Sequence, residues 1–232
     1  LFILSFFDFF HKRKIVNFLK KRNFYIDIFF DVGAHKGETV KLFEKNFEIR
    51  NFYCFEPSNT NFNYLKKEVL KMKKKNINIY NFALGNEIGN INFKQFKESS
   101  SSTITRINND SKYYKKKLKI LNFFSSNKED YKNEVVKIKT LKRFMDDNSI
   151  NSIDILKIDT EGYEFNVIKG AEIKIKKIKL VYFEHHFDDM LIKNYNFSDI
   201  NDFLTKNGFK KVYKSKMPFR KSFEYIYENI QN

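Results

Sequence analysis

The 232-residue chain is long enough for one α/β domain with a full hydrophobic core, and it is short for two domains. Its formal net charge of +16 raises the question of a nucleic-acid or anionic-membrane partner. The lysines are scattered, however, and we find no aromatic-interleaved RNA-binding signature, so we do not expect a nucleic-acid partner. Lys, Asn, Ile, Phe and Tyr all have AT-rich codons, and a biased base composition explains the charge more simply.

The cysteine content and the first residues bear on where the chain resides. Cys54 is the single cysteine, which excludes an intrachain disulfide and indicates a reducing, cytoplasmic compartment. Residues 1–10 are apolar but too short to span a bilayer, contain Asp8 and lack the features of a signal peptide. We predict that residues 1–24 form a helical extension that packs on the main domain, residues 25–232. A partner surface and a peripheral membrane anchor are the alternatives for this extension.

The chain is organised around residues 25–40, where an apolar run ends at Asp31 and is followed by Gly33, Gly37 and helical spacing. This order is typical of a buried strand, a tight turn and a helix N-terminus in a nucleotide-binding α/β unit. The spacing matches neither the dinucleotide fingerprint nor the P-loop. The early acid suits a ligand with a cationic amine, such as S-adenosyl-L-methionine (SAM), although a plain strand-to-helix turn is the alternative. We expect the Asp31 carboxylate to point into the crevice at the end of its strand.

The rest of the chain alternates predicted strands and helices, which indicates a mostly parallel sheet with helices on both faces. Strands are predicted at residues 52–55, 77–83, 91–93, 134–140, 153–158, 178–184, 209–213 and 222–227. Helices are predicted at residues 15–22, 40–47, 59–73, 141–147, 164–168 and 198–204, the last with Ser198 as its cap. We expect residues 77–83 and 91–93 to form a hairpin, and residues 98–126 to form a loop over the site.

Several predicted strands end in an acid, namely Asp31, Glu56, Asp159 and Glu184. Because the carboxyl ends of parallel strands meet at one edge of a sheet, these acids predict an acidic rim on an otherwise basic chain. Glu56, at the end of the second strand, can accept hydrogen bonds from both ribose hydroxyls of an adenosine. Residues 81–85 would approach the adenine ring, with Leu84 against it, or else form a core strand and a turn.

Lys157 lies in a run that the pattern buries on both faces, so we expect it to pair with a strand-end acid, with a catalytic amine as the alternative. Candidates for a general base or for substrate contact are Asp159, Glu161, Glu184, His185 and His186. Because side chains alternate along a strand, one of the two histidines must point away from the site. A divalent metal among these residues is an alternative, but no ligand spacing is diagnostic and we predict none.

A set of motifs occurs in the order found in one protein family. They are Asp31-Val32-Gly33-Ala34-His35-Lys36-Gly37, Phe55-Glu56-Pro57, Ala83-Leu84-Gly85 and Leu156-Lys157-Ile158-Asp159-Thr160-Glu161-Gly162-Tyr163-Glu164. Over roughly residues 26–184 the chain resembles the FkbM family of SAM-dependent methyltransferases. The resemblance implies a class I methyltransferase (Rossmann-like) fold, with a seven-stranded, mostly parallel sheet whose last strand is antiparallel. It also implies SAM as the cofactor and O-methyl transfer, commonly to sugars or secondary metabolites, hence a role in polysaccharide biosynthesis.

The resemblance also assigns roles to residues. Asp31, Gly33 and Gly37 would line the methionine end of SAM and Glu56 would hold the ribose, while His35 stands where the family often has Asn. The predicted cofactor-binding set is Asp31, Gly33, His35, Gly37, Glu56, Pro57, Ala83 and Leu84. The predicted catalytic set is Asp159, Glu161, His185 and His186.

The acceptor is expected to be a small molecule or a glycan. Its specificity would depend on the first thirty or so residues and on the tail beyond about residue 190, because both lie outside the resemblance. Methylation of RNA or protein, and SAM binding without methyl transfer in a glycan pathway, are the alternatives. The sequence predicts no oligomeric state.

Overall fold

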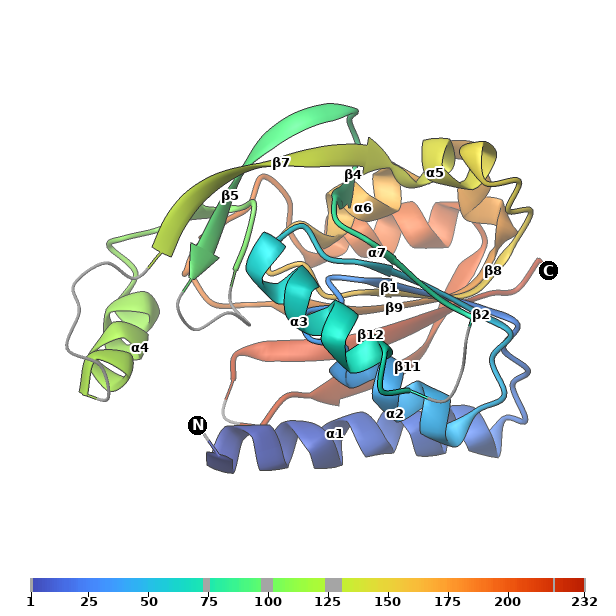
Figure 1. The fold of residues 1–232 in the computed structure, drawn as a ribbon, viewed down its shortest axis with the longest axis horizontal. Helices are drawn as coiled ribbons and strands as arrows, with labels where there is room; N and C mark the ends of the chain where they lie inside the picture. The colour runs from blue at the N-terminus through green and yellow to red at the C-terminus, as the bar shows by residue number, and fades with distance from the viewer. Residues whose placement is uncertain (1, 73–75, 97–101, 124–130, 219, 232) are drawn as a thin grey trace.

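The computed structural model describes residues 2–72, 76–96, 102–123, 131–218 and 220–231 (Figure 1). Its main sheet contains β1 (Ile28–Val32), β2 (Asn51–Phe55), β3 (Ile77–Tyr80), β8 (Ile153–Ile158), β9 (Ile178–His186), β11 (Phe209–Lys216) and β12 (Ser222–Asn229). The shorter sheets contain β4 (Ala83–Gly85), β5 (Gly89–Phe96), β6 (Arg106–Ile107), β7 (Tyr131–Thr140) and β10 (Leu191–Ile192). The helices are α1 (Phe2–Lys21), α2 (Glu38–Asn46), α3 (Asn59–Val69), α4 (Lys112–Phe123), α5 (Leu141–Asp147), α6 (Glu164–Lys169), the 3-10 helix η2 (Glu172–Lys177) and α7 (Phe197–Lys206).

The main sheet has the strand order β11-β12-β9-β8-β1-β2-β3. The central strands are parallel, with Asp31 beside Cys54 on β2 and beside Lys157 on β8. Strand β12 runs antiparallel to both of its neighbours, β9 and β11. The predicted seven-stranded, mostly parallel sheet with an antiparallel last strand is therefore confirmed.

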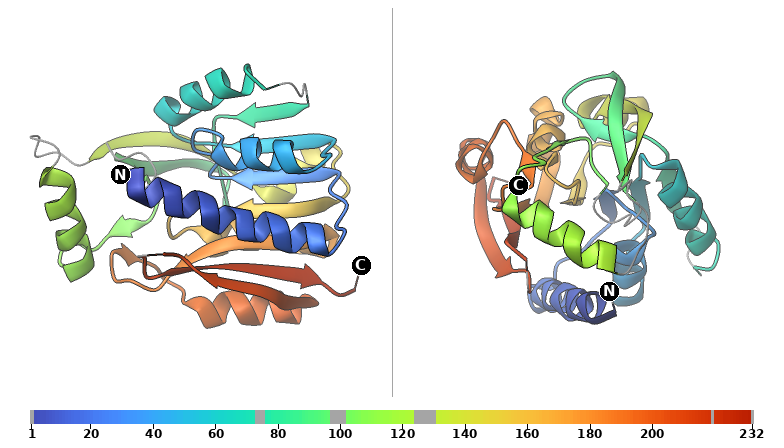
Figure 2. Two further views of the ribbon diagram at one scale, coloured as in Figure 1. Left: turned by 90° about the horizontal axis from the view of Figure 1, so that it is seen from below. Right: turned by 90° about the vertical axis from the view of Figure 1, so that its left-hand side faces the viewer.

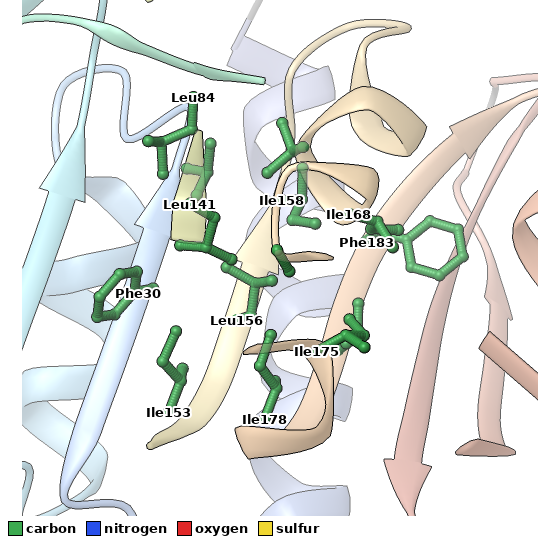
Figure 3. Packing of buried hydrophobic residues seen from close by; sticks show 14 of the residues in the cluster. Phe30, Leu84, Leu141, Ile153, Leu156, Ile158, Ile168, Ile175, Ile178 and Phe183 are labelled. Atoms are coloured by element: carbon green, nitrogen blue, oxygen red, sulfur yellow. The ribbon is translucent and has the colours of Figure 1, made fainter. Parts of the chain in front are cut away.

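Helices cover both faces of this sheet, as the sequence predicts (Figure 2). Buried side chains of α1, α2 and α3 pack with Phe29, Ile155 and Tyr182 on one face. Those of α5, α6, η2 and α7 pack with Leu156 and Phe183 on the other face. Consecutive strand residues point to opposite faces, so the mainly apolar central strands supply side chains to both cores. Figure 3 shows the second of these cores.

The N-terminal helix α1 is docked along the sheet. Its side chains Ile15, Val16 and Leu19 are at most 3% exposed, and they recur at the spacing that places residues on one face of a helix. In Figure 2, α1 crosses the same face that α2 covers. Within the described residues, no helix combines the length and the apolar character needed to cross a membrane.

The region after β3 differs from the predicted hairpin. The run predicted as one strand, residues 77–83, is divided between β3 in the main sheet and β4 in a three-stranded sheet. Strand β7 lies between β4 and β5 there, parallel to β4 and antiparallel to β5, so the predicted hairpin is wrong. Strand β7 pairs along the whole of β5, Gly89–Phe96, whereas β4 has only three residues to offer it.

Two further expectations are corrected. Within residues 98–126, the described part contains strand β6 and helix α4, so a simple loop is wrong there; residues 98–101 and 124–126 lie outside the described residues. The cap of α7 is Asn196, whose side chain accepts hydrogen bonds from the Ser198 and Asp199 backbone N–H groups. The Asp199 carboxylate reciprocates, which completes a capping box and moves the helix start to Phe197.

Candidate functional site

The turn between β1 and α2 is shaped by its two glycines. Gly33 and Gly37 have φ values of 81° and 89°, in the left-handed region that favours glycine. A Cβ on Gly33 would lie 1.9 Å from the backbone oxygen of Asp159, so only glycine allows this approach of the two loops. The backbone N–H groups of Gly33 and Ala34 both donate to the oxygen of Phe55, which ties the turn to the end of β2.

A buried ion pair lies at the ends of β1 and β8. The Nζ of Lys157 is 2.9 Å from Oδ1 of Asp31 and 3.6 Å from Oδ2 of Asp159, and it donates to the Gly33 backbone oxygen. Burial by itself would lower the pKa of Lys157, but the carboxylates of Asp31 and Asp159 outweigh burial and raise the pKa above its usual value. Lys157 is therefore a charged structural partner of strand-end acids, as the first of our two sequence interpretations expects.

Asp31 is placed differently from our expectation. Its side chain is fully buried and faces Lys157, so it does not reach an open crevice. The partly exposed acid of this group is Asp159, whose side chain is 30% exposed. A direct contact between Asp31 and a cofactor remains a prediction.

Glu56, at the end of β2, is held by backbone donors. Its Oε2 accepts from the His35 N–H at 2.8 Å, and its Oε1 accepts from the Ser58 N–H at 3.0 Å. Burial raises the pKa of Glu56 to about 7, against the lowering effect of these hydrogen bonds. The Asn61 side chain is a third donor to this carboxylate. A carboxylate has about four lone-pair sites in all, so Glu56 keeps acceptor capacity for one further donor, such as a ribose hydroxyl.

The other predicted cofactor residues surround Glu56 or lie in the core. The His35 Nδ1 lies 3.0 Å from Oε1 of Glu38, and Asn81 donates to the Pro57 backbone oxygen at 3.1 Å. Ala83 and Leu84 are at most 4% exposed and belong to the core in Figure 3, where Leu84 is labelled. An adenine contact for these two residues remains a prediction.

The turn between β8 and α6 has an unusual backbone that polar side chains fix. Glu161 has a φ of 52°, a conformation that non-glycine residues adopt rarely. Its backbone oxygen accepts from the hydroxyl of Thr103, at 2.6 Å. Oε1 of Glu164 accepts from the Gly162 N–H, and its Oε2 accepts from the Tyr195 hydroxyl. Strained backbone of this kind is common at functional sites.

His186 lies among carboxylates at the end of β9. Its Nε2 is 3.4 Å from Glu161 and 3.5 Å from Glu184, and its Nδ1 is 3.5 Å from Asp188. Burial alone would lower the pKa of His186, but the acids raise it to about 10, so the ring is protonated at neutral pH. A protonated ring cannot serve as the general base. Burial raises the pKa of Glu184 to about 7, which makes Glu184 the better proton acceptor.

His185 is the histidine that points away from these acids. It is 2% exposed and contacts the rings of Phe187, Tyr195 and Phe197 on the opposite face of the sheet. Burial, with the charges of Lys193 and His186, lowers the pKa of His185 to about 3. His185 is therefore the histidine of the pair that the strand directs away from the acids, and its place in the catalytic set remains a prediction.

The structure also adds residues that our sequence analysis did not single out. Thr103 fixes the Glu161 backbone, Asp188 contacts His186, and Tyr195 binds Glu164. Glu164 was visible in the last motif, but the other three lie far from it in the sequence and carried no local signal. Among the described residues, no group of three or more His, Cys, Asp or Glu side chains is arranged to hold a metal ion.

Comparison with solved structures defines the class of fold. The structure resembles the methyltransferase FkbM from Methylobacillus flagellatus KT, with a TM-score of 0.56 and 12% identity over 88% of this chain and 44% of that chain. It also resembles magnesium protoporphyrin IX methyltransferase (ChlM) from Synechocystis PCC 6803 with bound SAM, with a TM-score of 0.53 and 9% identity over 94% of this chain and 77% of that chain. The fold is therefore that of the class I SAM-dependent methyltransferases. This chain spans less than half the length of the M. flagellatus protein.

The family follows from the sequence itself. The model of the methyltransferase FkbM domain matches residues 31–211, which is most of the chain. The chain therefore belongs to the FkbM methyltransferase family, and its cofactor is SAM. No curated protein matched the chain.

The residues present fit this cofactor. Gly33 lets the turn after β1 lie directly against the Asp159 backbone, which brings the ends of β1 and β8 together, and Glu56 retains acceptor capacity at the end of β2. The acids Asp159 and Glu184 provide negative charge at the same edge for a cationic ligand.

Proposed function

We propose that the chain methylates a hydroxyl of a sugar, a glycan or a secondary metabolite, as a cytoplasmic step of polysaccharide or metabolite biosynthesis. The observation that carries this proposal is the acid cluster at the carboxyl edge of the sheet. Asp159 is partly exposed there, and Glu184, whose pKa is about 7, lies beside the protonated His186. A base with a pKa near the working pH suits removal of a hydroxyl proton.

The proposed mechanism divides the work among these side chains. Glu56 would hold the ribose of the cofactor, and SAM would supply a methyl group on a positively charged sulfur. Asp159 would orient the acceptor hydroxyl, and Glu184 would accept its proton as the new oxygen–carbon bond replaces the bond between the methyl carbon and sulfur, which would leave a neutral thioether. His186 stabilises the ionised form of Glu184, which lies 3.5 Å from its ring. The main contribution of the protein is to hold the hydroxyl close to the methyl group and in line with its bond to sulfur.

The acceptor is best sought among glycans. We would compare, by mass spectrometry, the glycans and small metabolites of cells with and without the gene, searching for products heavier by one CH2 group. A methylated product that reappears with purified protein and labelled SAM supports the proposal. SAM binding without any such product would indicate a non-catalytic SAM-binding protein.

The proton acceptor is tested by the pH dependence of turnover. Because Glu184 must be ionised, we expect kcat to rise with pH through about 7 in the wild type. Glu184→Gln should lower kcat by roughly 10²-fold and remove this rise, whereas Asp159→Asn should lower kcat but keep it. An unchanged pH profile in Glu184→Gln would contradict the assignment.

RNA methylation is the second candidate, and two observations favour it. The chain carries a formal charge of +16. A putative tRNA (m1A22) methyltransferase, Streptococcus pneumoniae Sp1610 with SAM, shares the fold with a TM-score of 0.50 and 12% identity over 93% of this chain and 72% of that chain. Steeply salt-dependent binding of tRNA, with methyl transfer to it, would replace the glycan proposal.

A further inference from the structure

The acids of the site lie on the face of the sheet that α1 covers. Tyr182 packs in the same core as the buried side chains of α1. Glu184 and His186 follow at alternate positions of β9 and so share this face. Lys157 pairs with Tyr182 across the strands, which places Lys157 and Asp31 on this face as well. Helix α1 therefore runs along the face that holds the site.

A buried polar contact fixes where α1 sits relative to these acids. Nε2 of His11 is 2.6 Å from Oε2 of Glu224, and both side chains are at most 5% exposed. Glu224 is the cross-strand partner of Glu184, and it also accepts from the Tyr182 hydroxyl at 2.6 Å. The contact of His11 thus sets the helix at the level of Glu184.

Lys12 follows His11 and lies one turn before the buried Val16, at the border of the packed stripe. Its positive charge acts to lower the pKa values of the Asp31, Glu38 and Asp159 carboxyl groups. No carboxylate among the described residues lies within ion-pair distance of it, in contrast to Lys157. Lys12 is therefore a half-buried cation whose charge acts on several acids. It forms no ion pair with any carboxylate in the described part of the chain.

The chemistry of the cofactor supplies a partner for such a cation. The methionine end of SAM carries both an ammonium and a carboxylate. Asp159, which lies beside the glycine turn and is partly exposed, suits the ammonium, and the carboxylate requires a donor of opposite charge. The charge of Lys12 acts on Asp31, before the turn, and on Glu38, after it. These two acids are the ends of the segment expected to line the methionine end.

We propose that Lys12 binds the carboxylate of SAM, so that α1 is a wall of the cofactor site. This inference rests on the proposed function of the same site. It extends the site to α1, which lies outside the segment that the family model matches, residues 31–211. A cation–carboxylate contact in a partly buried site adds affinity and selects ligands that carry the carboxylate.

Calorimetric titration of the full chain with two ligands tests the proposal. The probes are SAM and decarboxylated SAM, which keeps the sulfonium and the amine but lacks the carboxylate. We expect Lys12→Gln to weaken SAM binding about 10-fold to 30-fold and to leave decarboxylated SAM within about 2-fold of the wild type. Lys12→Arg should restore most of the SAM affinity. The matched control is Lys14→Gln, which changes an exposed lysine of the same helix.

The outcomes separate the two proposals. Failure of the wild type to bind either ligand would overturn the proposed function as well. Binding of SAM by Lys12→Gln with wild-type affinity would overturn only the role of Lys12. Equal weakening of both ligands would also overturn it, because Lys12 would then act through the fold.

Discussion

Two adjacent histidines at the end of β9 are in opposite environments. His186 faces carboxylates on the α1 side of the sheet, and its pKa is raised to about 10. His185 faces aromatic rings on the α7 side, and its pKa is lowered to about 3. The comparison shows that, because side chains alternate along a strand, one residue of this dipeptide faces the acids of the candidate site and the other packs in the aromatic core. The two sheet faces can therefore be perturbed independently.

Removing the buried ammonium of Lys157, on the α1 side of the sheet, should have the largest effect on stability. Lys157→Met leaves Asp31 buried without its partner, and we expect the free energy of unfolding to fall by about 3–5 kcal/mol. Lys115→Met, which removes an exposed ion pair with Asp110, should cost less than about 1 kcal/mol. Urea denaturation followed by circular dichroism measures both. Similar losses of unfolding free energy in the two variants would show that the buried ion pair contributes no more to stability than the exposed one.

Substitution of His186 should reduce activity far more than substitution of His185, because only His186 faces the acids. His186→Gln removes the charge beside Glu184, and we expect kcat/KM to fall by roughly 10²-fold. His185→Phe keeps an aromatic ring among its aromatic neighbours, and we expect kcat/KM within about threefold of the wild type. Transfer of labelled methyl from SAM to the identified acceptor measures both. Equal losses would mean that His185 also serves the site.

The pH dependence of stability should carry the signature of His186. Its folded pKa of about 10 lies above the ordinary value of 6.5, so protonation favours the folded state. This contribution is fully present below pH 6.5 and is lost as the pH rises from 6.5 to about 10. The difference in unfolding free energy between wild type and His186→Gln should therefore shrink over that window. A constant difference would contradict the raised pKa.

Direct titration of the two rings is the mildest test of the comparison. Nuclear magnetic resonance of labelled histidine should show His185 neutral down to a pH of about 3 and His186 protonated up to about 10. The two single variants assign the signals. If both rings titrated between pH 6 and 7, the proposed difference between the environments of His185 and His186 would be wrong.

The main sheet was predictable because its information is local. Runs such as residues 153–158 are mainly apolar and buried, and each ends in an acid or a turn, so their order and the carboxyl edge follow from spacing alone. The pairing of Lys157 with a strand-end acid also followed, since a buried ammonium has few other solutions. The need for one histidine to point away followed from alternation.

The errors arose where partners are distant in sequence. Residues 77–83 and 91–93 have the pattern of a hairpin, but β7, which is distant in sequence, pairs with β4 on one side and with the whole of β5 on the other. Which histidine faces the acids depends on the register of β9, and the charge of His186 depends on Asp188 and Glu161 together. The contact of His11 with Glu224 joins the two ends of the chain, and no local sequence pattern around either residue predicts it.

The position of β8 in the main sheet has a consequence for synthesis. Strand β8 lies between β1 and β9, so the open edge of β1 stays unpaired until β8 has left the ribosome. At a translation rate of about 5–20 residues per second, a growing chain exposes that apolar edge for several seconds. We expect nascent chains halted before β8 to bind chaperones or aggregate, and those released after β12 to fold.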